Sequence, residues 1–146
     1  MEIRNYLPGD AAKLVAICKN APEAAQWPAQ AYERAHSYGQ IILVAEAEGR
    51  VAGFVVARAA GDEAEILNMA VENAERRKGV GQALLSGALE EARGVGCKKV
   101  FLEVREGNAT AIAFYRQYRF CEIGKRTGYY RDPTEDATLM QKRIED

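Results

Sequence analysis

The spacing of apolar and polar residues along the chain predicts an alternation of strands and helices. Alternating or continuous apolar runs, typical of strands, occupy residues 2–6, 41–47, 51–59, 63–71, 99–104, 121–128 and 137–143. Apolar residues at helical spacing predict helices over residues 11–18, 29–37, 82–93 and 108–118. The predicted elements begin mainly with strands, continue with strand–helix units and end with two strands. This order favours an α/β fold with a mixed sheet and helices on both faces.

Local signals mark the ends of several elements. Asp10 follows a Pro-Gly turn and can cap the helix that begins after it. The turn Glu48-Gly49-Arg50 joins two strands as a hairpin. No linker, internal repeat or low-complexity segment divides the 146 residues, and a chain of this length can bury about two-thirds of its unfolded surface. The sequence therefore predicts one domain, residues 1–146.

Composition and charge narrow the class of protein. The formal net charge is −1, so no global basic field favours nucleic acid, and charge-driven recognition would be local. Cys18, Cys97 and Cys121 are widely spaced and His36 is the single histidine, which argues against a zinc site and a disulfide framework. The first residues lack the apolar core of a signal peptide, and no apolar run reaches membrane length. We expect a metal-free, monomeric protein of the reducing cytoplasm, with no direct contact to nucleic acid or membrane.

The most informative stretch is Arg76-Arg77-Lys78-Gly79-Val80-Gly81, between an apolar strand and an amphipathic helix. Two glycines one residue apart let the backbone approach a ligand closely. The amides that follow are the unpaired donors of a helix N-terminus, and three cations raise the local potential. The stretch lacks the third glycine of a dinucleotide fingerprint, because Leu84 occupies that position, and it lacks the Gly-Lys-Ser/Thr of a Walker loop. The predicted ligand is a pyrophosphate.

The pattern Arg-x-x-Gly-x-Gly in this strand–loop–helix setting resembles the signature of the GNAT acetyltransferases. The similarity continues in Leu102-Glu103-Val104-Arg105, in Asn-x-x-Ala-x-x-x-Tyr at 108–115, and in residues 128–131 and 135–137. Together these segments resemble the RimI branch of the family, which acetylates the N-terminal alanine of a small-subunit ribosomal protein. The resemblance covers nearly the whole chain and is strongest over residues 65–140.

This resemblance implies the GNAT fold, with a central, mixed, mostly antiparallel sheet. Two parallel strands, residues 65–71 and 99–104, would splay apart and admit the pantetheine arm of acetyl-CoA. The implied coenzyme-binding residues are Met69, Ala70, Val71, Arg76, Arg77, Lys78, Gly79, Val80, Gly81, Gln82 and Asn108. The first three would contribute backbone groups, which otherwise belong to an ordinary core strand.

Glu103 is the candidate general base. Alternation along residues 99–104 places Phe101, Glu103 and Arg105 on one face of the strand. A carboxylate beside Phe101 would be partly desolvated, which raises its pKa toward usefulness as a base. The strand pattern alone favours a solvated polar face or an ion pair with Arg105. The resemblance implies the catalytic role.

Tyr115 is the candidate general acid. It follows Asn108 by seven residues, two helical turns, so both lie on nearly one face of the helix. A phenol can give a proton to a departing thiolate, although a tyrosine on an amphipathic helix is more often a core residue. The resemblance implies the acid at Tyr115 and coenzyme contact at Asn108, which could also be a plain N-cap. Tyr118 is the second candidate acid.

The acceptor is expected to be a protein N-terminus, held by Trp27, Tyr129 and Tyr130. Adjacent residues of an extended strand face opposite ways, so we expect one of the two tyrosines to line the groove. A basic substrate tail would need acids, and Glu46, Asp62, Glu63 and Glu135 are candidates.

Two positions depart from the family pattern. The turn begins Arg76-Arg77-Lys78 where many members have glutamine, a change that should strengthen pyrophosphate binding if anything. Arg119 stands at a helix end where the family usually has glycine, and arginine disfavours the left-handed conformation found there. Two other functions remain open: a GNAT that acetylates a small amine or a lysine side chain, and a non-catalytic acyl-CoA sensor. The presence of both Glu103 and Tyr115 argues against the sensor.

Overall fold

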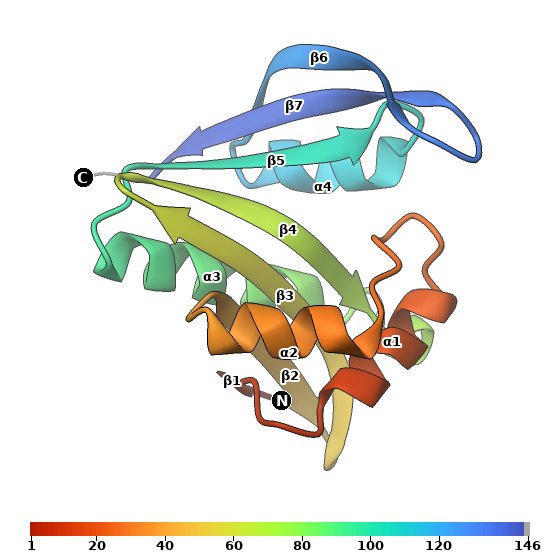
Figure 1. The fold of residues 1–146 in the computed structure, drawn as a ribbon, viewed down its shortest axis with the longest axis vertical. Helices are drawn as coiled ribbons and strands as arrows, with labels where there is room; N and C mark the ends of the chain where they lie inside the picture. The colour runs from red at the N-terminus through yellow and green to blue at the C-terminus, as the bar shows by residue number, and fades with distance from the viewer. Residues whose placement is uncertain (145–146) are drawn as a thin grey trace.

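The computed structural model describes residues 1–144, which form one seven-stranded sheet covered by helices on both faces (Figure 1). The strand order is β1-β2-β3-β4-β5-β7-β6, and only β4 and β5 pair in parallel. The strands are β1 (Glu2–Asn5), β2 (Ile41–Ala47), β3 (Arg50–Ala60), β4 (Glu63–Val71), β5 (Lys99–Arg105), β6 (Cys121–Tyr130) and β7 (Glu135–Arg143). The helices are α1 (Ala11–Lys19), α2 (Ala29–Ser37), α3 (Val80–Gly94) and α4 (Ala109–Gln117), with a short 3-10 turn η1 (Asn73–Glu75). The expected fold class is confirmed.

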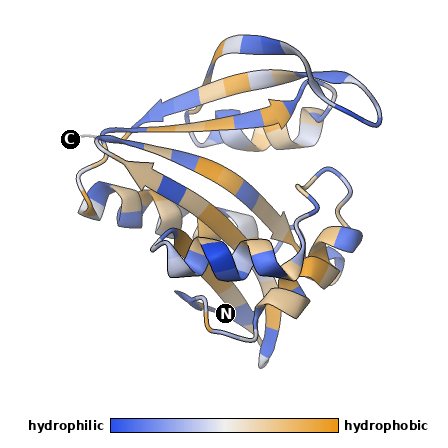
Figure 2. Ribbon diagram, in the orientation of Figure 1, coloured by the Kyte–Doolittle hydropathy of each residue, from blue (hydrophilic) through white to orange (hydrophobic). Residues whose placement is uncertain are grey.

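Two hydrophobic cores lie on opposite faces of the sheet. One lies beneath α3 and α4 and contains Leu84 and Leu85 of α3. The other lies beneath α1 and α2 and contains Leu14 and Tyr32. Strands β2 and β3 are buried on both faces over residues 42–45 and 52–57, so these stretches lack the polar alternation of a half-exposed strand (Figure 2). Strand β4 contributes to both cores, whereas the buried residues of β5 belong to the core beneath α3 and α4.

The pairing of β4 with β5 covers only half of each strand. The ladder runs from Glu63 opposite Lys99 to Ile66 opposite Leu102 and ends there. Beyond this point the two strands diverge (Figure 1). The expected splay is therefore present.

A β-bulge in β4 lies where the splay begins. On the β3 side, Val56 faces Asn68 but Ala57 faces Ile66, so Leu67 is an extra residue in β4. As a result, Ile66 belongs to the α3 core and Ala70 to the α1–α2 core, although regular alternation would place both on one face. The bulge thus reverses which face of the sheet the end of β4 presents to each core.

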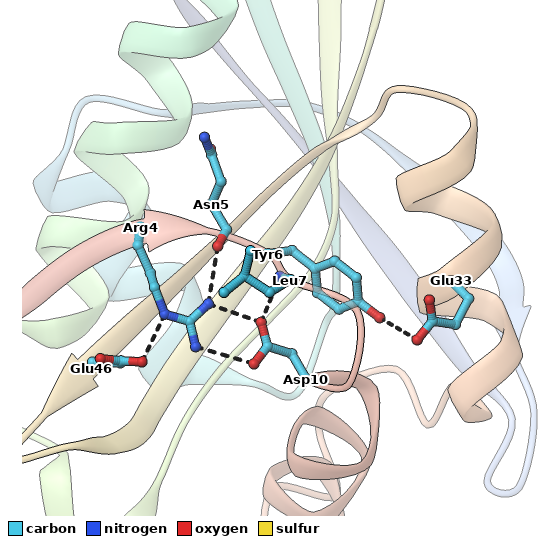
Figure 3. Close-up of polar contacts among 7 residues, drawn as sticks. All are labelled: Arg4, Asn5, Tyr6, Leu7, Asp10, Glu33 and Glu46. Carbon is cyan, nitrogen blue, oxygen red and sulfur yellow. Dashed lines mark hydrogen bonds and ion pairs between the residues drawn. The ribbon is translucent and has the colours of Figure 1, made fainter.

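A polar cluster joins β1 to α1 and α2 (Figure 3). The guanidinium of Arg4 donates to both carboxylate oxygens of Asp10 at 2.9 and 3.1 Å and to Glu46 of β2 at 2.7 Å. The hydroxyl of Tyr6 donates to Glu33 of α2 at 2.7 Å. Asp10 precedes α1 as expected, but its side chain makes no capping hydrogen bond to the helix. The prediction of a side-chain cap was wrong, because the carboxylate is turned toward Arg4.

Candidate functional site

The glycine turn forms the N-terminus of α3. Gly79 precedes the helix with φ of +82°, a left-handed conformation that glycine adopts without steric cost. No side chain caps α3, so its first amides point outward uncovered by a capping group. A Cβ on Gly81 would lie 3.5 Å from the ring of Phe114 and 3.8 Å from Val71, so this helix end adjoins both α4 and the end of β4. Such a terminus can bind phosphate, and Val80 and Gln82 lie in the same first turn.

The cations of the turn are held by weak, exchangeable contacts. Arg76 donates to the carbonyl of Val71 at 3.3 Å and lies 3.6 Å from Glu23. Lys78 lies 3.5 Å from Glu75. These pairs are solvent-exposed, and pairs of this kind contribute little to stability. The side chains, with that of Arg77, can therefore turn toward an anion at small energetic cost.

The divergent half of β4 has one edge without strand partners. Met69, Ala70 and Val71 pair with β3 on one side, but the β5 ladder has ended before them. Their backbone groups on that edge can pair with an extended ligand that enters between the strands. Asn108 precedes α4 and accepts a hydrogen bond from the amide of Ala111 at 3.1 Å. Asn108 is thus an N-cap, and its contact with a coenzyme stays a prediction.

Glu103 has a buried carboxylate oxygen without a hydrogen-bond partner in the described part of the chain. Its side chain is 13% exposed, and Oε1 lies 3.7 Å from Nε of Arg126 in β6. Its Oε2 atom is buried and has no hydrogen-bond partner among residues 1–144. The alternative pair with Arg105 is wrong, because Arg105 bonds Glu135 at 3.2 Å instead. One carboxylate oxygen of Glu103 thus remains available to accept a proton or a hydrogen bond.

Tyr129 and Tyr130 lie together near Glu103. Their ring centroids are 5.1 Å apart. Burial raises the pKa of both phenols, the negative charge of Glu103 raises it further, and the pKa of Tyr130 reaches about 12. The expectation that the two residues face opposite ways was wrong. Gly128 has φ of +61° and the ladder with β7 is irregular between Arg126 and Tyr130, so the pleat of a regular strand is lost there.

Tyr115 lies on the opposite face of the sheet from Glu103. It is 8% exposed, packs against Phe114 and belongs to the α3–α4 core, whereas Glu103 points away from that core. Burial raises the pKa of Tyr115, and the neighbouring Tyr130 adds to the effect. A phenol with a raised pKa stays protonated at neutral pH, as a proton donor must. Tyr118 packs on Phe114 with ring centroids 4.9 Å apart and is less buried.

The remaining sequence candidates have structural contacts of their own. Trp27 lies in the loop between α1 and α2 and packs on Tyr32 with ring centroids 5.2 Å apart, at the edge of a core. Among the acids considered for a basic tail, Glu46 pairs with Arg4 and Glu135 with Arg105. Sequence reasoning missed Arg126, because a basic residue in an exposed edge strand gives no local signal of the carboxylate it meets.

Two broader properties bear on the class of protein. Among residues 1–144, no group of three or more His, Cys, Asp or Glu side chains could hold a metal ion. Within the same residues, no helix is long and apolar enough to cross a membrane. The fold and the site define an α/β protein whose splayed parallel strands end beside the N-terminus of a helix that a left-handed glycine precedes, with a carboxylate and phenols nearby.

Comparison with known proteins identifies the family. The model of the acetyltransferase (GNAT) family matches residues 11–120, and the chain belongs to this family. The [ribosomal protein bS18]-alanine N-acetyltransferase of Escherichia coli strain K12 is 39% identical over 94 residues, which span 63% of this chain and 64% of that protein. The N-alpha-acetyltransferase of Sulfolobus acidocaldarius is 34% identical over 121 residues, 74% of this chain and 71% of that protein.

Solved structures agree with this assignment. The crystal structure of the ribosomal-protein-S18-alanine N-acetyltransferase from Escherichia coli superposes with a TM-score of 0.87 at 29% identity, covering 99% of this chain and 94% of that one. Ard1 from Thermoplasma volcanium gives a TM-score of 0.91 at 30% identity, covering 99% and 98%. The family expected from the sequence is confirmed.

Proposed function

We propose that this chain transfers the acetyl group of acetyl-CoA to the α-amino group of a protein N-terminus. We further propose that the acceptor is the N-terminal alanine of a small-subunit ribosomal protein. Two relatives that carry these activities in their names support the proposal, and the Escherichia coli enzyme supports the ribosomal target. The observation that carries it is the buried, unpartnered Oε2 of Glu103 at the open end of the splayed strands.

The residues at hand fit acetyl-CoA as the cosubstrate. The left-handed Gly79 and the uncapped start of α3 suit its pyrophosphate, and the unpaired edge of β4 suits the amides of its pantetheine arm. Acetyl-CoA supplies the acetyl group as a thioester. The chain must then orient the acceptor amine, remove its proton and protonate the departing sulfur.

The proposed chemistry divides between two residues. The neutral acceptor amine attacks the thioester carbonyl with its nitrogen lone pair, and Glu103 accepts the proton that the nitrogen then loses, directly or through one water. The new C–N bond forms and the C–S bond breaks. Tyr115 donates its phenolic proton to the departing thiolate. The proton balance closes when the phenolate regains a proton from solvent or from Glu103.

An α-amine suits this site better than a lysine side chain. A protein N-terminus has a pKa of about 7.7–8.0, against about 10.4 for lysine. A carboxylate base therefore meets a much larger fraction of neutral α-amine near pH 7. Residues 1–146 are proposed to act in the cytoplasm as one monomeric domain, with no direct contact to nucleic acid.

The test is acetyl transfer to a matched panel of acceptors. It contains a short peptide with a free N-terminal alanine, the same peptide with a blocked N-terminus, a blocked peptide that contains lysine, and spermidine. Transfer to the free alanine peptide that disappears on blocking is the expected result. Transfer to lysine or spermidine alone would mean that the acceptor is a side-chain or small-molecule amine rather than a protein N-terminus. Coenzyme binding without any transfer would indicate an acyl-CoA sensor.

A further inference from the structure

The loop between α1 and α2 is attached to the divergent half of β4 by one buried side chain. Asn68 is 5% exposed and its amide pairs with the backbone of Ala25 in both directions. Its Oδ1 accepts from the amide of Ala25 at 3.2 Å, and its Nδ2 donates to the carbonyl of Ala25 at 3.0 Å. Nδ2 also donates to the hydroxyl of Tyr32 at 3.2 Å. Every polar atom of this side chain is therefore used to hold the loop and α2.

The loop is already folded on itself, so Asn68 sets its position more than its shape. The side-chain amide of Gln26 donates to the carbonyls of Cys18, Ala21 and Ala24 at 2.7–3.2 Å. Trp27 packs on the ring of Tyr32. Because the α1–α2 loop is held together by its own contacts, we expect it to move as a unit when its attachment to β4 through Asn68 is lost.

The turn between β6 and β7 is attached to β5 in the same manner. The guanidinium of Arg105 donates to the carbonyls of Pro133 and Arg131 at 3.3 and 3.4 Å and to Glu135 at 3.2 Å. It also lies over the ring of Tyr130, 4.4 Å from the centroid. The planar fork of arginine can serve these acceptors together, whereas the ammonium of lysine is a single point charge.

Glu135 extends this attachment to the start of α4. Its Oε2 accepts from the amide of Gly107 at 2.6 Å, while its Oε1 binds Arg105. A Cβ at position 107 would lie 2.6 Å from the same oxygen, so the glycine lets the carboxylate reach the backbone. Arg105 and Glu135 together thus join the β6–β7 turn, β5 and the loop before α4.

The two attachments occupy matching places in the fold. The β4–β5 ladder ends at Ile66 and Leu102, and Asn68 and Arg105 follow two and three residues later, one on each diverging strand. We propose that Asn68 and Arg105 are positioning residues that hold the two loops on either side of the acceptor, without touching the acceptor themselves. This inference rests on the proposed function, and it adds that each splayed strand carries one side chain dedicated to an acceptor loop.

Loss of either attachment should affect acceptor binding selectively. The loop would have to be ordered when the peptide binds, so the KM of the acceptor peptide should rise about tenfold, while kcat changes by less than about threefold. Acetyl-CoA affinity should not change, because neither residue belongs to the glycine turn or to the unpaired edge of residues 69–71. A purely structural role would lower thermal stability without this split between KM and kcat.

The experiment compares Asn68→Leu and Arg105→Lys with wild type. Leucine matches the shape of asparagine without its polar atoms, and lysine keeps the charge of arginine without its fork. The matched control is Arg93→Lys, because Arg93 likewise donates to a backbone carbonyl, that of Ile144 at 2.8 Å, and pairs with Glu90 at the far end of α3. For each protein, kcat and KM for the alanine peptide, the Kd of acetyl-CoA by calorimetry, and the unfolding temperature are measured.

The outcomes separate the inference from the function on which it rests. A rise in peptide KM in both variants but not in Arg93→Lys, with coenzyme Kd unchanged, is the expected result. Wild-type peptide KM in folded variants would overturn the inference and leave the proposed function intact. If Asn68→Leu does not fold, Asn68→Ala, which leaves room for water to replace the amide, takes its place. No transfer to any peptide by wild type would overturn the proposed function, and this inference with it.

Discussion

Replacing Arg119 by glycine should stabilise the protein. Arg119 follows α4 with φ of +72°, and the amide of Phe120 donates to the carbonyl of Tyr115 at 3.0 Å to close the helix end. The left-handed conformation costs a residue with a Cβ about 1–2 kcal/mol. Glycine removes this cost, but its greater conformational freedom in the unfolded chain destabilises the folded protein by about 0.5–1 kcal/mol. The net gain in the free energy of unfolding should be about 0.5–1 kcal/mol, because the Arg119 side chain is exposed and removing it loses little.

The assay for Arg119→Gly is urea unfolding with calorimetry beside it. A gain of this size corresponds to a rise in Tm of about 1–4 °C for a chain of this length. The control is Arg119→Ala, which removes the same side chain but keeps the Cβ and therefore the backbone strain. Equal stability of the Gly and Ala variants would refute the reasoning, since the gain must come from the backbone alone. Acetyl transfer should not change, because the substitution leaves the position of Tyr115 in α4 intact.

Further predictions concern the chemistry, the coenzyme and the effect of pH. Glu103→Gln and Tyr115→Phe should each lower the single-turnover rate about 10²–10⁴-fold. Acetyl-CoA affinity should be nearly unchanged, and a wild-type rate would remove that residue from the mechanism. Gly81→Asp should abolish acetyl-CoA binding by calorimetry because it places a carboxylate beside the pyrophosphate, and unchanged affinity would mean that the phosphates bind elsewhere. Burial raises the pKa of Asp10, but the hydrogen bonds from Arg4 and a backbone amide outweigh it and leave the pKa below its ordinary value. Asp10 therefore stabilises the fold above its unfolded pKa of about 4, and this contribution disappears as pH falls through the lower folded value, which urea unfolding of wild type and Asp10→Asn at several pH values would reveal.

The features predicted correctly from the sequence are those that local chemistry determines. The glycine turn is an example, because the left-handed Gly79 and the uncapped start of α3 depend on residues within a few positions. The faces of β5 are another, since alternation alone separates the half-buried side of Glu103 from the core side of Leu102. The order of the elements also followed from apolar periodicity, with boundaries shifted by one or two residues in most of them.

The features that were missed depend on contacts between different elements of the folded protein. The bulge at Leu67 arises from how β4 pairs with β3, and an unbroken apolar strand gives no sign of it. The side chain of Asp10 could cap α1 by sequence, yet Arg4 and Leu7 compete for it in the folded protein. Likewise, Tyr129 was expected to face away from its neighbour because nothing nearby in sequence reports the irregular ladder with β7.

The unpartnered oxygen of Glu103 belongs to the residue at which the splay begins. A buried polar atom without a partner costs about 1–3 kcal/mol, and folded proteins rarely retain one. The β4–β5 ladder ends at Leu102, so Glu103 is the next residue of β5 and has no partner in β4. The fold therefore accepts the cost of an unsatisfied carboxylate at the place where an entering amine could satisfy it. Glu103 has a carboxylate oxygen that is free to accept a proton, whereas Glu135 is paired with Arg105. The proposed reaction therefore depends on Glu103 rather than on Glu135.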